Sequence, residues 1–262
     1  MIDFHSHILP NIDDGSRSVE ETINLIKEAK EAGFTGISLT SHYIENYYET
    51  GKEERKLLIN VIKEQLQEKG IDIDLYIANE VYITDNIIEL LKDGKISTIN
   101  EGSYLLFEMP LNVNQEPMNL DNVIYSMQEN KIIPVLAHPE RYSFIQKEPN
   151  IVLDLIDQGV LMQANYGSIL GQYGQRAKLV IEKLLENDMI HFLGSDVHRA
   201  NSIYKQIPEV LEKIEEIIGA EALKELTTIN PNLAIANKQL EIYEPGEIEL
   251  TRKEKFKMFF KK

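Results

Sequence analysis

The chain has 262 residues, of which 43% are hydrophobic and 27% charged, a composition typical of a globular protein long enough for one large α/β domain. Its formal net charge of −16 argues against nucleic acid as a main partner, because duplex binding depends on Lys and Arg that neutralise phosphates. The absence of cysteine excludes disulfides, thiolate zinc sites and cysteine nucleophiles. The chain shows no recognisable signal peptide and no apolar run long enough to cross a membrane, so we expect a cytoplasmic protein.

Apolar strand-like runs recur along the chain at intervals of roughly 30 to 40 residues, and an amphipathic helical stretch follows each of them. The strands that we expect are 2–4, 36–40, 75–79, 104–107, 133–137, 161–164 and 191–194. The first helix should begin at the capping box of Ser18 and Glu21 and end at Gly33. Further helices are expected at 53–68, 119–129, 151–158, 175–187 and 205–218.

This alternation of strands and helices is typical of a parallel sheet. Seven units favour a closed or nearly closed barrel over an open sheet, and no Gly-rich dinucleotide fingerprint follows the first strand. We therefore predict a single distorted TIM-like (β/α)7 barrel over residues 1–250, followed by a basic tail over residues 251–262. In such barrels the chemistry lies on the loops at the C-terminal ends of the strands.

Side chains that can bind metal gather at those strand ends. All of them are imidazoles or carboxylates, the ligand set of Zn, Mn or Fe in hydrolytic sites. The candidate ligands are His5, His7, Asp14, His42, Glu80, Glu108, His138, Asp196 and His198. They include five of the six histidines in the chain. The sixth, His191, lies at the start of its strand, at the opposite end of the barrel, and we interpret it as structural.

Two pairs among these candidates have the same spacing. His5 and His7 are two residues apart on an extended segment, so both side chains leave the same face. Asp196 and His198 repeat this spacing after the seventh strand. Closure of a barrel makes the first and seventh strands neighbours, and we expect the two pairs to meet there.

The other candidates have alternative explanations when each is taken alone. Glu80 and Glu108 end apolar runs, where an unpaired carboxylate is costly and a cation offsets the cost; the alternative is an ion-paired glutamate at a strand end. His42 could be a core histidine with satisfied hydrogen bonds, and Asp14 could be a turn residue. Asp13 is an equally good turn former, so the spacing leaves the choice between Asp13 and Asp14 open.

Arginines near these positions could bind a phosphoryl group. Arg141 follows shortly after Pro139, which should stop helix formation and leave the arginine on a loop over the site. A guanidinium there suits bidentate recognition of phosphate, and the alternative is a surface salt bridge with Glu140 or Glu148. Arg199 is a second candidate for the same role, and Arg17 in the first loop is a third.

The segments DFHSH, DDGS, LTSH, NE, FE, HPER and SDVH resemble, in this order, the motifs of the PHP (polymerase and histidinol phosphatase) superfamily, over about residues 1–240. Within it the chain resembles the bacterial manganese-dependent protein-tyrosine phosphatases associated with capsule and exopolysaccharide synthesis. This resemblance implies a (β/α)7 barrel of the PHP type that holds three divalent metal ions, expected to be Mn²⁺, although N/O sites of this kind also accept Fe or Zn.

The resemblance also implies how the ligands are divided among the ions. One ion would be bound by His5, His7, Glu80 and Asp196, the second by Glu80, Glu108 and His138, and the third by Asp14, His42 and His198. The chain departs from the family pattern at one point. A second phosphate-binding arginine is expected several residues after the DxH pair, where this chain has Ser-Ile-Tyr-Lys at 202–205, and the nearest arginine is Arg199.

The expected activity is hydrolysis of phosphotyrosine on a protein, in particular the tail of a bacterial tyrosine kinase, by a water that bridges two metals and is deprotonated near neutral pH. A tyrosinate leaving group, with a parent pKa of ~10, needs less acid assistance than a serine alkoxide. The alternatives are a phosphatase of a small metabolite such as histidinol phosphate, a phosphodiesterase, and a regulatory binding module on an inactive scaffold. The basic, phenylalanine-containing tail at 251–262 suggests weak contact with an anionic membrane, against the alternative of a solvated tail.

Overall fold

Parallel strands in two hydrogen-bonded sheets form the centre of the computed structural model, which describes residues 1–200 and 203–255. The first sheet has the order β1 (Ile2–Ser6), β2 (Gly36–Leu39) and β4 (Asp74–Ile77). The second has the order β3 (His42–Tyr43), β5 (Glu80–Tyr82), β6 (Tyr104–Glu108), β7 (Ile133–Ala137), β8 (Leu161–Asn165) and β9 (Phe192–Gly194). Neighbouring strands pair in parallel throughout both sheets.

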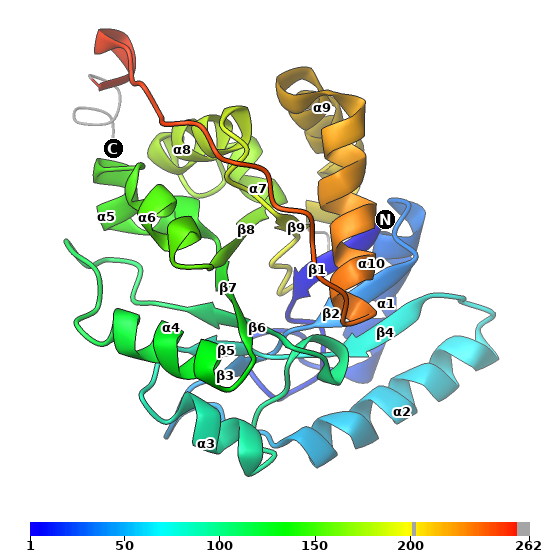
Figure 1. Ribbon diagram of the computed structural model, residues 1–262. Helices are drawn as coiled ribbons and strands as arrows, with labels where there is room; N and C mark the ends of the chain where they lie inside the picture. The colour runs from blue at the N-terminus through cyan, green and yellow to red at the C-terminus, as the bar shows by residue number, and fades with distance from the viewer. Residues whose placement is uncertain (201–202, 256–262) are drawn as a thin grey trace.

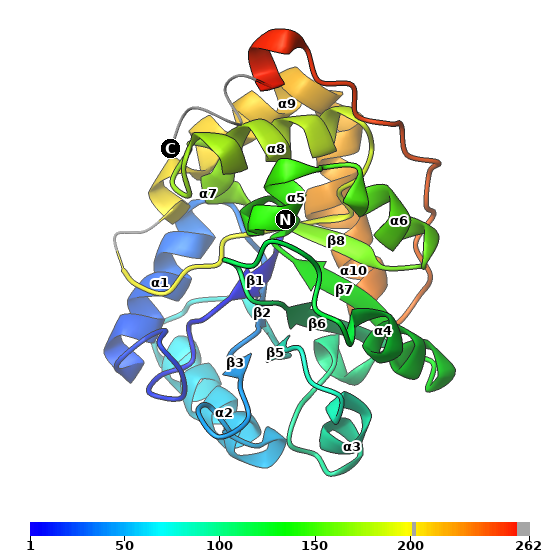
Figure 2. The same ribbon diagram turned by 90° about the vertical axis from the view of Figure 1, so that its left-hand side faces the viewer.

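The two sheets join to form a curled, barrel-like ring. On one side Ser6 forms a parallel bridge with Val197, and the Asp196 amide donates to the His5 carbonyl at 2.8 Å. On the other side β4 runs into β5 after a break at residues 78–79, so the chain passes directly from the first sheet to the second. The helices surround the strands on the outside (Figure 2). The prediction of a distorted TIM-like α/β barrel is confirmed.

All seven expected strands are present, with small differences at their ends. The short strands β3 and β5 were not expected, because each follows an expected strand after a break of only a few residues. As a consequence His42 and Glu80 begin short strands of their own, where the prediction had placed them just beyond a longer strand. β3 and β5 pair with His42 opposite Glu80, and this register brings the two side chains together.

The helices that show a clear amphipathic pattern in the sequence are also present. They are α1 (Val19–Glu31), α2 (Lys52–Glu68), α4 (Leu120–Glu129), α6 (Ile151–Asp157), α8 (Gln175–Glu186) and α9 (Ile207–Lys224), the last preceded by the 3₁₀ turn η3 (Ile203–Gln206). Ser18 caps α1 by accepting a hydrogen bond from the Glu21 amide, as predicted. Gly33, with φ of +94°, ends it in a left-handed conformation that favours glycine.

Several short helical segments were not expected, because they contain too few residues to show a helical period. They are α3 (Ile87–Lys92), η1 (Ile99–Glu101), η2 (Pro139–Arg141), α5 (Ser143–Lys147), α7 (Tyr166–Ile169), the π-helix η4 (Glu225–Ile229) and α10 (Asn230–Ile235). The 3₁₀ turn η2 corrects one prediction. Pro139 does not stop helix formation; it occupies the first turn of η2, where its missing N–H costs nothing, and Arg141 lies on this turn and not on an irregular loop.

A bulge in β1 turns two consecutive side chains toward the barrel interior. Asp3 pairs with Ile37 and Ser6 with Leu39, so the strand contains one extra residue between these pairs. Phe4 consequently stacks on Phe192 of β9, with ring centroids 3.9 Å apart, and the next residue, His5, contacts Gln163 of β8. The apolar pair fills the barrel below the polar rim that His5 joins.

After α10 the chain runs along the outside of the barrel toward residue 255 (Figure 1). This segment is attached to the barrel, because Asn150 and Ile248 exchange two hydrogen bonds of 3.1 and 2.9 Å and Lys183 pairs with Glu254 at 3.0 Å. The predicted membrane contact falls mostly on residues 256–262, which lie outside the described residues, and the boundary at residue 251 stays a prediction. Among the described helices, none combines the length and the apolar character needed to cross a membrane.

Candidate metal centre

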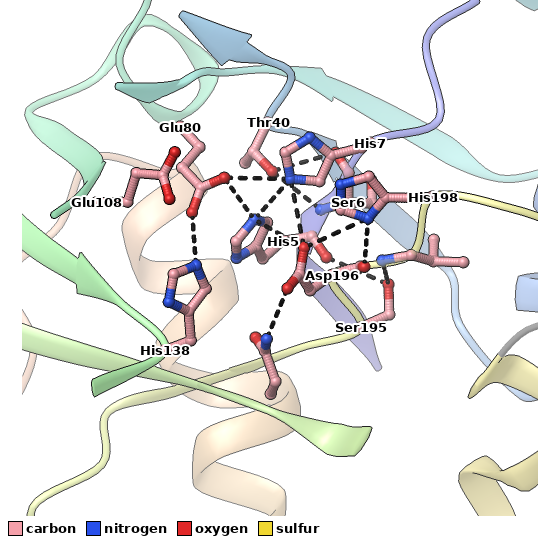
Figure 3. Close-up of polar contacts among 12 residues, drawn as sticks. His5, Ser6, His7, Thr40, Glu80, Glu108, His138, Ser195, Asp196 and His198 are labelled. Carbon is pink, nitrogen blue, oxygen red and sulfur yellow. Dashed lines mark hydrogen bonds and ion pairs between the residues drawn. The ribbon is translucent and has the colours of Figure 1, made fainter. Parts of the chain in front are cut away.

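The candidate ligands come from distant parts of the sequence and meet at the C-terminal ends of the strands, and Figure 3 shows this for all of them except Asp14 and His42. Three overlapping groups have ligand atoms within 4.8 Å of one another: His5, His7 and Asp196; His42, Glu80 and Glu108; and His7, Asp14, His42 and His198. The ninth candidate, His138, joins them through Glu80, whose Oε1 lies 2.9 Å from its Nε2. All nine predicted side chains therefore belong to one continuous cluster.

His5 and His7 point the same ring atom at one place. Their Nε2 atoms are 2.9 Å apart, while Nδ1 of His5 lies 2.6 Å from Gln163 Oε1 and Nδ1 of His7 lies 3.0 Å from Asp13 Oδ2. Both of these partners are acceptors, so each Nδ1 carries the hydrogen, and Nε2 is the atom that presents a lone pair whenever the ring is neutral. Two lone pairs at this distance repel each other unless a proton or a cation lies between them, which fits a metal position.

Glu80 lies at the middle of the cluster. Its Oε2 is 3.3 Å from His5 Nε2, 3.2 Å from His7 Nε2 and 3.0 Å from His42 Nδ1. Burial alone would raise the pKa of this carboxyl, but the neighbouring histidines, His5 and His42 foremost, hold the pKa well below its ordinary value. Glu80 is therefore charged, and its two oxygens reach opposite sides of the cluster, as a bridging ligand requires.

His42 has carboxylates on both sides of its ring. Its Nδ1 lies 3.0 Å from Glu80 Oε2 and 3.2 Å from Glu108 Oε1, and its Nε2 lies 3.6 Å from Asp14 Oδ1. Burial alone would lower its pKa, but Glu80 and Glu108 raise the pKa of His42 to about 12. The carboxylates therefore produce a strongly negative potential at this point, which favours a bound cation.

The choice that the sequence left open between Asp13 and Asp14 can now be made on contacts. Asp13 is buried behind the cluster, where its carboxylate accepts hydrogen bonds from His7 Nδ1, from the Gly15 amide at 2.9 Å and from the His42 amide at 2.9 Å. Asp14 faces the cluster, with Oδ1 3.3 Å from His198 Nε2, and this hydrogen bond lowers the pKa of Asp14 to about 2. Asp13 therefore orients His7 from behind, while Asp14 faces the cluster, and ion binding by Asp14 stays a prediction.

The groups differ in part from the division that the family resemblance implies. His7 lies close to Asp14 and His198 as well as to His5, and His42 reaches Glu80 and Glu108 as well as Asp14. The structure thus brings the expected side chains together without separating them into three distinct sets.

Two amides on β8 support the cluster, and sequence reasoning missed both. Gln163 accepts from His5 Nδ1 and donates to the Asn165 side chain at 3.0 Å; Asn165 in turn donates to Asp196 Oδ2 at 2.7 Å. These polar residues occur two apart in an otherwise apolar strand, the same spacing as His5 and His7. That spacing is the signal that could have revealed them.

Removing the Gln163 acceptor is expected to weaken metal binding. Gln163→Met keeps the volume but leaves Nδ1–H of His5 unpaired, so metal affinity should fall by roughly 10- to 100-fold. Gln163→Glu retains an acceptor at this position and serves as the control. Competition with a chromophoric chelator measures both variants, and an unchanged dissociation constant in Gln163→Met would contradict the assigned role.

A second buried network joins β1 to the segment that carries Asp196. The carboxylate of Asp3 accepts hydrogen bonds from the Ser195 amide at 2.8 Å, from Ser195 Oγ at 2.6 Å and from the Tyr204 hydroxyl at 2.6 Å. Burial raises the pKa of this carboxyl. Because Asp3 and His5 lie on the same strand and Ser195 precedes Asp196, the network fixes the two sides of the cluster relative to each other.

Arg141 lies at the edge of the cluster. Its Nη1 is 2.6 Å from Asp196 Oδ2, and its guanidinium lies 4.3 Å from the ring centroid of Tyr173. The alternative of a surface pair with Glu140 does not hold, because Glu140 is buried and accepts from Ser168 Oγ and the Asn165 amide. Arg141 therefore lies at the cluster, and its role in phosphate binding stays a prediction.

The other two arginines are placed differently. Arg199 donates through Nη1 to the carbonyl of His198 at 3.0 Å, so its guanidinium is turned toward its own backbone. Arg17 donates through its backbone amide to Glu21 in the exposed first turn of α1. The segment expected to carry a further phosphate-binding arginine includes residues 201–202, which lie outside the described part, and its Lys205 pairs with Glu28 at 3.7 Å.

His191 lies at the other end of the barrel, just before β9, where its Nδ1 accepts a hydrogen bond from the Met162 amide at 3.1 Å. Burial lowers the pKa of His191 from 6.5 to about 4, so this ring is neutral in the folded protein. The unfolded state binds the proton more readily between these pH values. This histidine therefore reduces the free energy of unfolding as the pH falls below 6.5.

The corresponding test compares wild type with His191→Asn, which keeps an acceptor for the Met162 amide but does not titrate. Urea unfolding in EDTA at pH 7.5 and 4.5 should show that wild type loses about 2–3 kcal/mol more than the variant. Equal losses would mean that the His191 ring is protonated in the folded protein.

The chain is similar to known proteins over most of its length. The family model described as capsular polysaccharide synthesis, CpsB/CapC, matches residues 1–236. A putative tyrosine-protein phosphatase CapC of Staphylococcus aureus is 36% identical over 76% of this chain and 77% of its own length. The tyrosine-protein phosphatase CpsB of Streptococcus pneumoniae is 30% identical over 91% of this chain and 99% of its own.

A solved structure agrees with these sequence matches. It comes from work on YwqE of Bacillus subtilis and CpsB of Streptococcus pneumoniae, described as unique metal-dependent tyrosine phosphatases. It superposes with a TM-score of 0.89 at 27% identity, over 95% of this chain and all of the other. The resemblance stated from sequence motifs is thereby confirmed, and the barrel is the one that this group of proteins shares.

Proposed function

The chain belongs to the CpsB/CapC family of capsular polysaccharide synthesis, and from this premise we propose that it is a metal-dependent protein-tyrosine phosphatase. The observation that carries the proposal is the pair of Nε2 atoms of His5 and His7, 2.9 Å apart, with the carboxylates of Glu80 and Asp196 within 3.2–3.7 Å of them. Such a set is stable when a cation lies inside it.

We propose that the cluster holds three divalent ions. The nitrogen and oxygen donors suit Mn²⁺, Fe or Zn, and the family resemblance favours Mn²⁺. The proposed ligands are His5, His7, Asp14, His42, Glu80, Glu108, His138, Asp196 and His198. Glu80 is the proposed bridge, because its two oxygens face different histidines.

Divalent ions in this cluster would supply Lewis acidity and a nucleophile at neutral pH. The protein's own part begins with burial: His5, His7 and Glu80 are inaccessible to solvent, so water is excluded from the inner side of the centre. Asp13 and Gln163 hold the two imidazoles in one tautomer. Side chains held in place in this way favour electrostatic stabilisation of the reacting group, because they need little reorganisation.

Arg141 is the proposed phosphate-binding residue. Burial alone would lower the pKa of Arg141, but Asp196 foremost raises it above its ordinary value, so the guanidinium stays charged throughout the physiological range. Its fork can donate to the non-bridging oxygens of a phosphoryl group. The zero cysteine count excludes a thiol nucleophile. The tyrosinate that leaves, with a parent pKa of ~10, can depart without a dedicated general acid.

The proposed substrate is a phosphotyrosine-bearing protein, in particular the tail of a bacterial tyrosine kinase, and the proposed location is the cytoplasm. Family membership in capsular polysaccharide synthesis supports both. Neither a metabolite such as histidinol phosphate nor a phosphodiester has a comparable observation in its favour.

Metal-reconstituted protein tests the proposal. Phosphotyrosine peptide should be hydrolysed much faster than phosphoserine peptide or histidinol phosphate, and EDTA should abolish the activity until Mn²⁺ is restored. Equal or faster turnover of a non-aryl substrate would overturn the substrate assignment. Turnover that survives complete chelation would overturn the metal dependence.

A further inference from the structure

The exposed fractions of the candidate ligand side chains show which side of the metal centre is open to solvent. His5 and Glu80 are buried, with 0% and 1% of their side chains accessible, whereas Asp14 is 52% and His198 29% exposed. Arg141 is intermediate at 21%. A phosphate group therefore enters from the side of Asp14 and His198, and whatever carries the phosphate remains at that mouth.

A tight hairpin at residues 44–48 lies beside this mouth, directly after β3. The amides and carbonyls of Ile44 and Tyr48 exchange two hydrogen bonds of 2.9 Å, with Asn46 at the turn in a left-handed conformation, φ +64°. Glu45 accepts a hydrogen bond from Thr84 at 2.6 Å, which ties the hairpin to the loop after β5. The hairpin is therefore fixed relative to the metal centre on two sides.

Two aromatic rings extend from the metal centre along this hairpin. The ring of Tyr48 is parallel to that of His42, with centroids 6.2 Å apart and an interplanar angle of 9°. Tyr47 meets Tyr48 edge to face at 4.6 Å, and 73% of it is exposed.

The opposite side of the centre has an aromatic ring that already has a partner. Tyr173 lies under the guanidinium of Arg141, and its hydroxyl is 3.5 Å from Asp196 Oδ2. Tyr47, in contrast, is exposed, and Tyr48 is partly exposed beside it. Exposed aromatic surface costs free energy unless a ligand covers it, and it prefers another aromatic ring in stacked or edge-to-face contact.

We propose that Tyr47 and Tyr48 form an aromatic wall that holds the phenyl ring of phosphotyrosine while its phosphate lies in the metal centre. This inference rests on the proposed function. It offers a physical reason why the phosphatase would prefer aryl phosphates over alkyl phosphates. The phosphate end of a substrate is bound through the metals and Arg141 whatever its ester. The wall distinguishes the aryl ester, because an alkyl chain cannot stack on it.

Binding of two phosphonates to the metal-loaded full-length protein tests the wall without any contribution from a leaving group. Phenylphosphonate and methylphosphonate share the phosphate-like head and differ by the ring. Tyr48→Leu and Tyr47→Ala should each raise the dissociation constant of phenylphosphonate by roughly 3- to 10-fold, while that of methylphosphonate stays the same. Tyr48→Phe should bind both as wild type does. Tyr125→Leu, which removes a similarly exposed tyrosine from the outer helix α4, is the matched control.

Equal weakening of both phosphonates would overturn the proposal, since it would mean that Tyr48 only supports His42. Unchanged phenylphosphonate binding in Tyr48→Leu and Tyr47→Ala would also overturn it. If Tyr48→Leu loses metal, phenylphosphonate binding by Tyr47→Ala becomes the deciding measurement. Tyr47 has no ring contact with His42 among the described aromatic pairs, so its replacement should leave the metal in place. Failure of the proposed function would show separately, as wild-type protein that does not hydrolyse phosphotyrosine.

Discussion

Glu80→Gln is expected to lower kcat/KM for a phosphotyrosine peptide by roughly 10³-fold or more, because a metal centre supplies several kcal/mol of charge stabilisation. The substitution keeps the shape of the side chain, removes the negative charge and replaces one carboxylate oxygen by an amide nitrogen that cannot bind metal. Glu80 lies between 2.9 and 3.3 Å from nitrogens of His5, His7, His42 and His138. Loss of its charge therefore weakens binding of more than one ion.

Metal content, measured by elemental analysis after dialysis, and steady-state kinetics check this expectation together. Glu101→Gln provides a matched control, since Glu101 is exposed, pairs with Lys52 and Lys56 on the outside of the barrel, and loses the same charge. The control should retain metal and activity. A Glu80→Gln protein that kept its full metal content and turned over within tenfold of wild type would contradict the bridging role.

The sequence predicted the strands well because buried parallel strands are continuous apolar runs. It pointed to the nine candidate ligands because an unpaired polar group at the end of a buried run is costly, and the structure brings these side chains together. The short strands β3 and β5 could not be predicted in this way, since His42–Tyr43 and Glu80–Tyr82 are too short to show a period. Their pairing nevertheless decides the geometry of the site, because it sets His42 opposite Glu80.

Other features depend on contacts that no local pattern encodes. Asp13 and Asp14 are chemically identical neighbours, and only the fold shows that one binds the back of His7 while the other faces His198. The supporting amides are similar in this respect, because Gln163 and its neighbour Asn165 become informative only when β8 lies beside β9. Sequence motifs thus point to the candidate ligands, while the positions of the residues that orient them come from strand order.

The contact between Arg141 and Asp196 is another that no local sequence pattern encodes. It leads to the second large effect on activity that we expect. Arg141→Ala should lower kcat/KM for phosphotyrosine by roughly 10²- to 10³-fold, the usual cost of removing a donor to a developing charge, while the metal content stays unchanged. Asp196 loses its contact with Nη1 at 2.6 Å in this variant but keeps the Asn165 hydrogen bond at 2.7 Å and its place beside His5. Its position as a ligand should therefore survive.

Arg141→Lys separates charge from geometry in the same measurement. Lysine restores the positive charge but not the planar fork, and it stacks less well on Tyr173, so it should recover only part of the lost activity. Vanadate binding to the metal-loaded variants gives a readout independent of turnover and should weaken in the order wild type, Lys, Ala. If Arg141→Ala instead lost metal in proportion to activity, the arginine would act only by neutralising Asp196. The phosphate contact would then have to come from elsewhere on the rim.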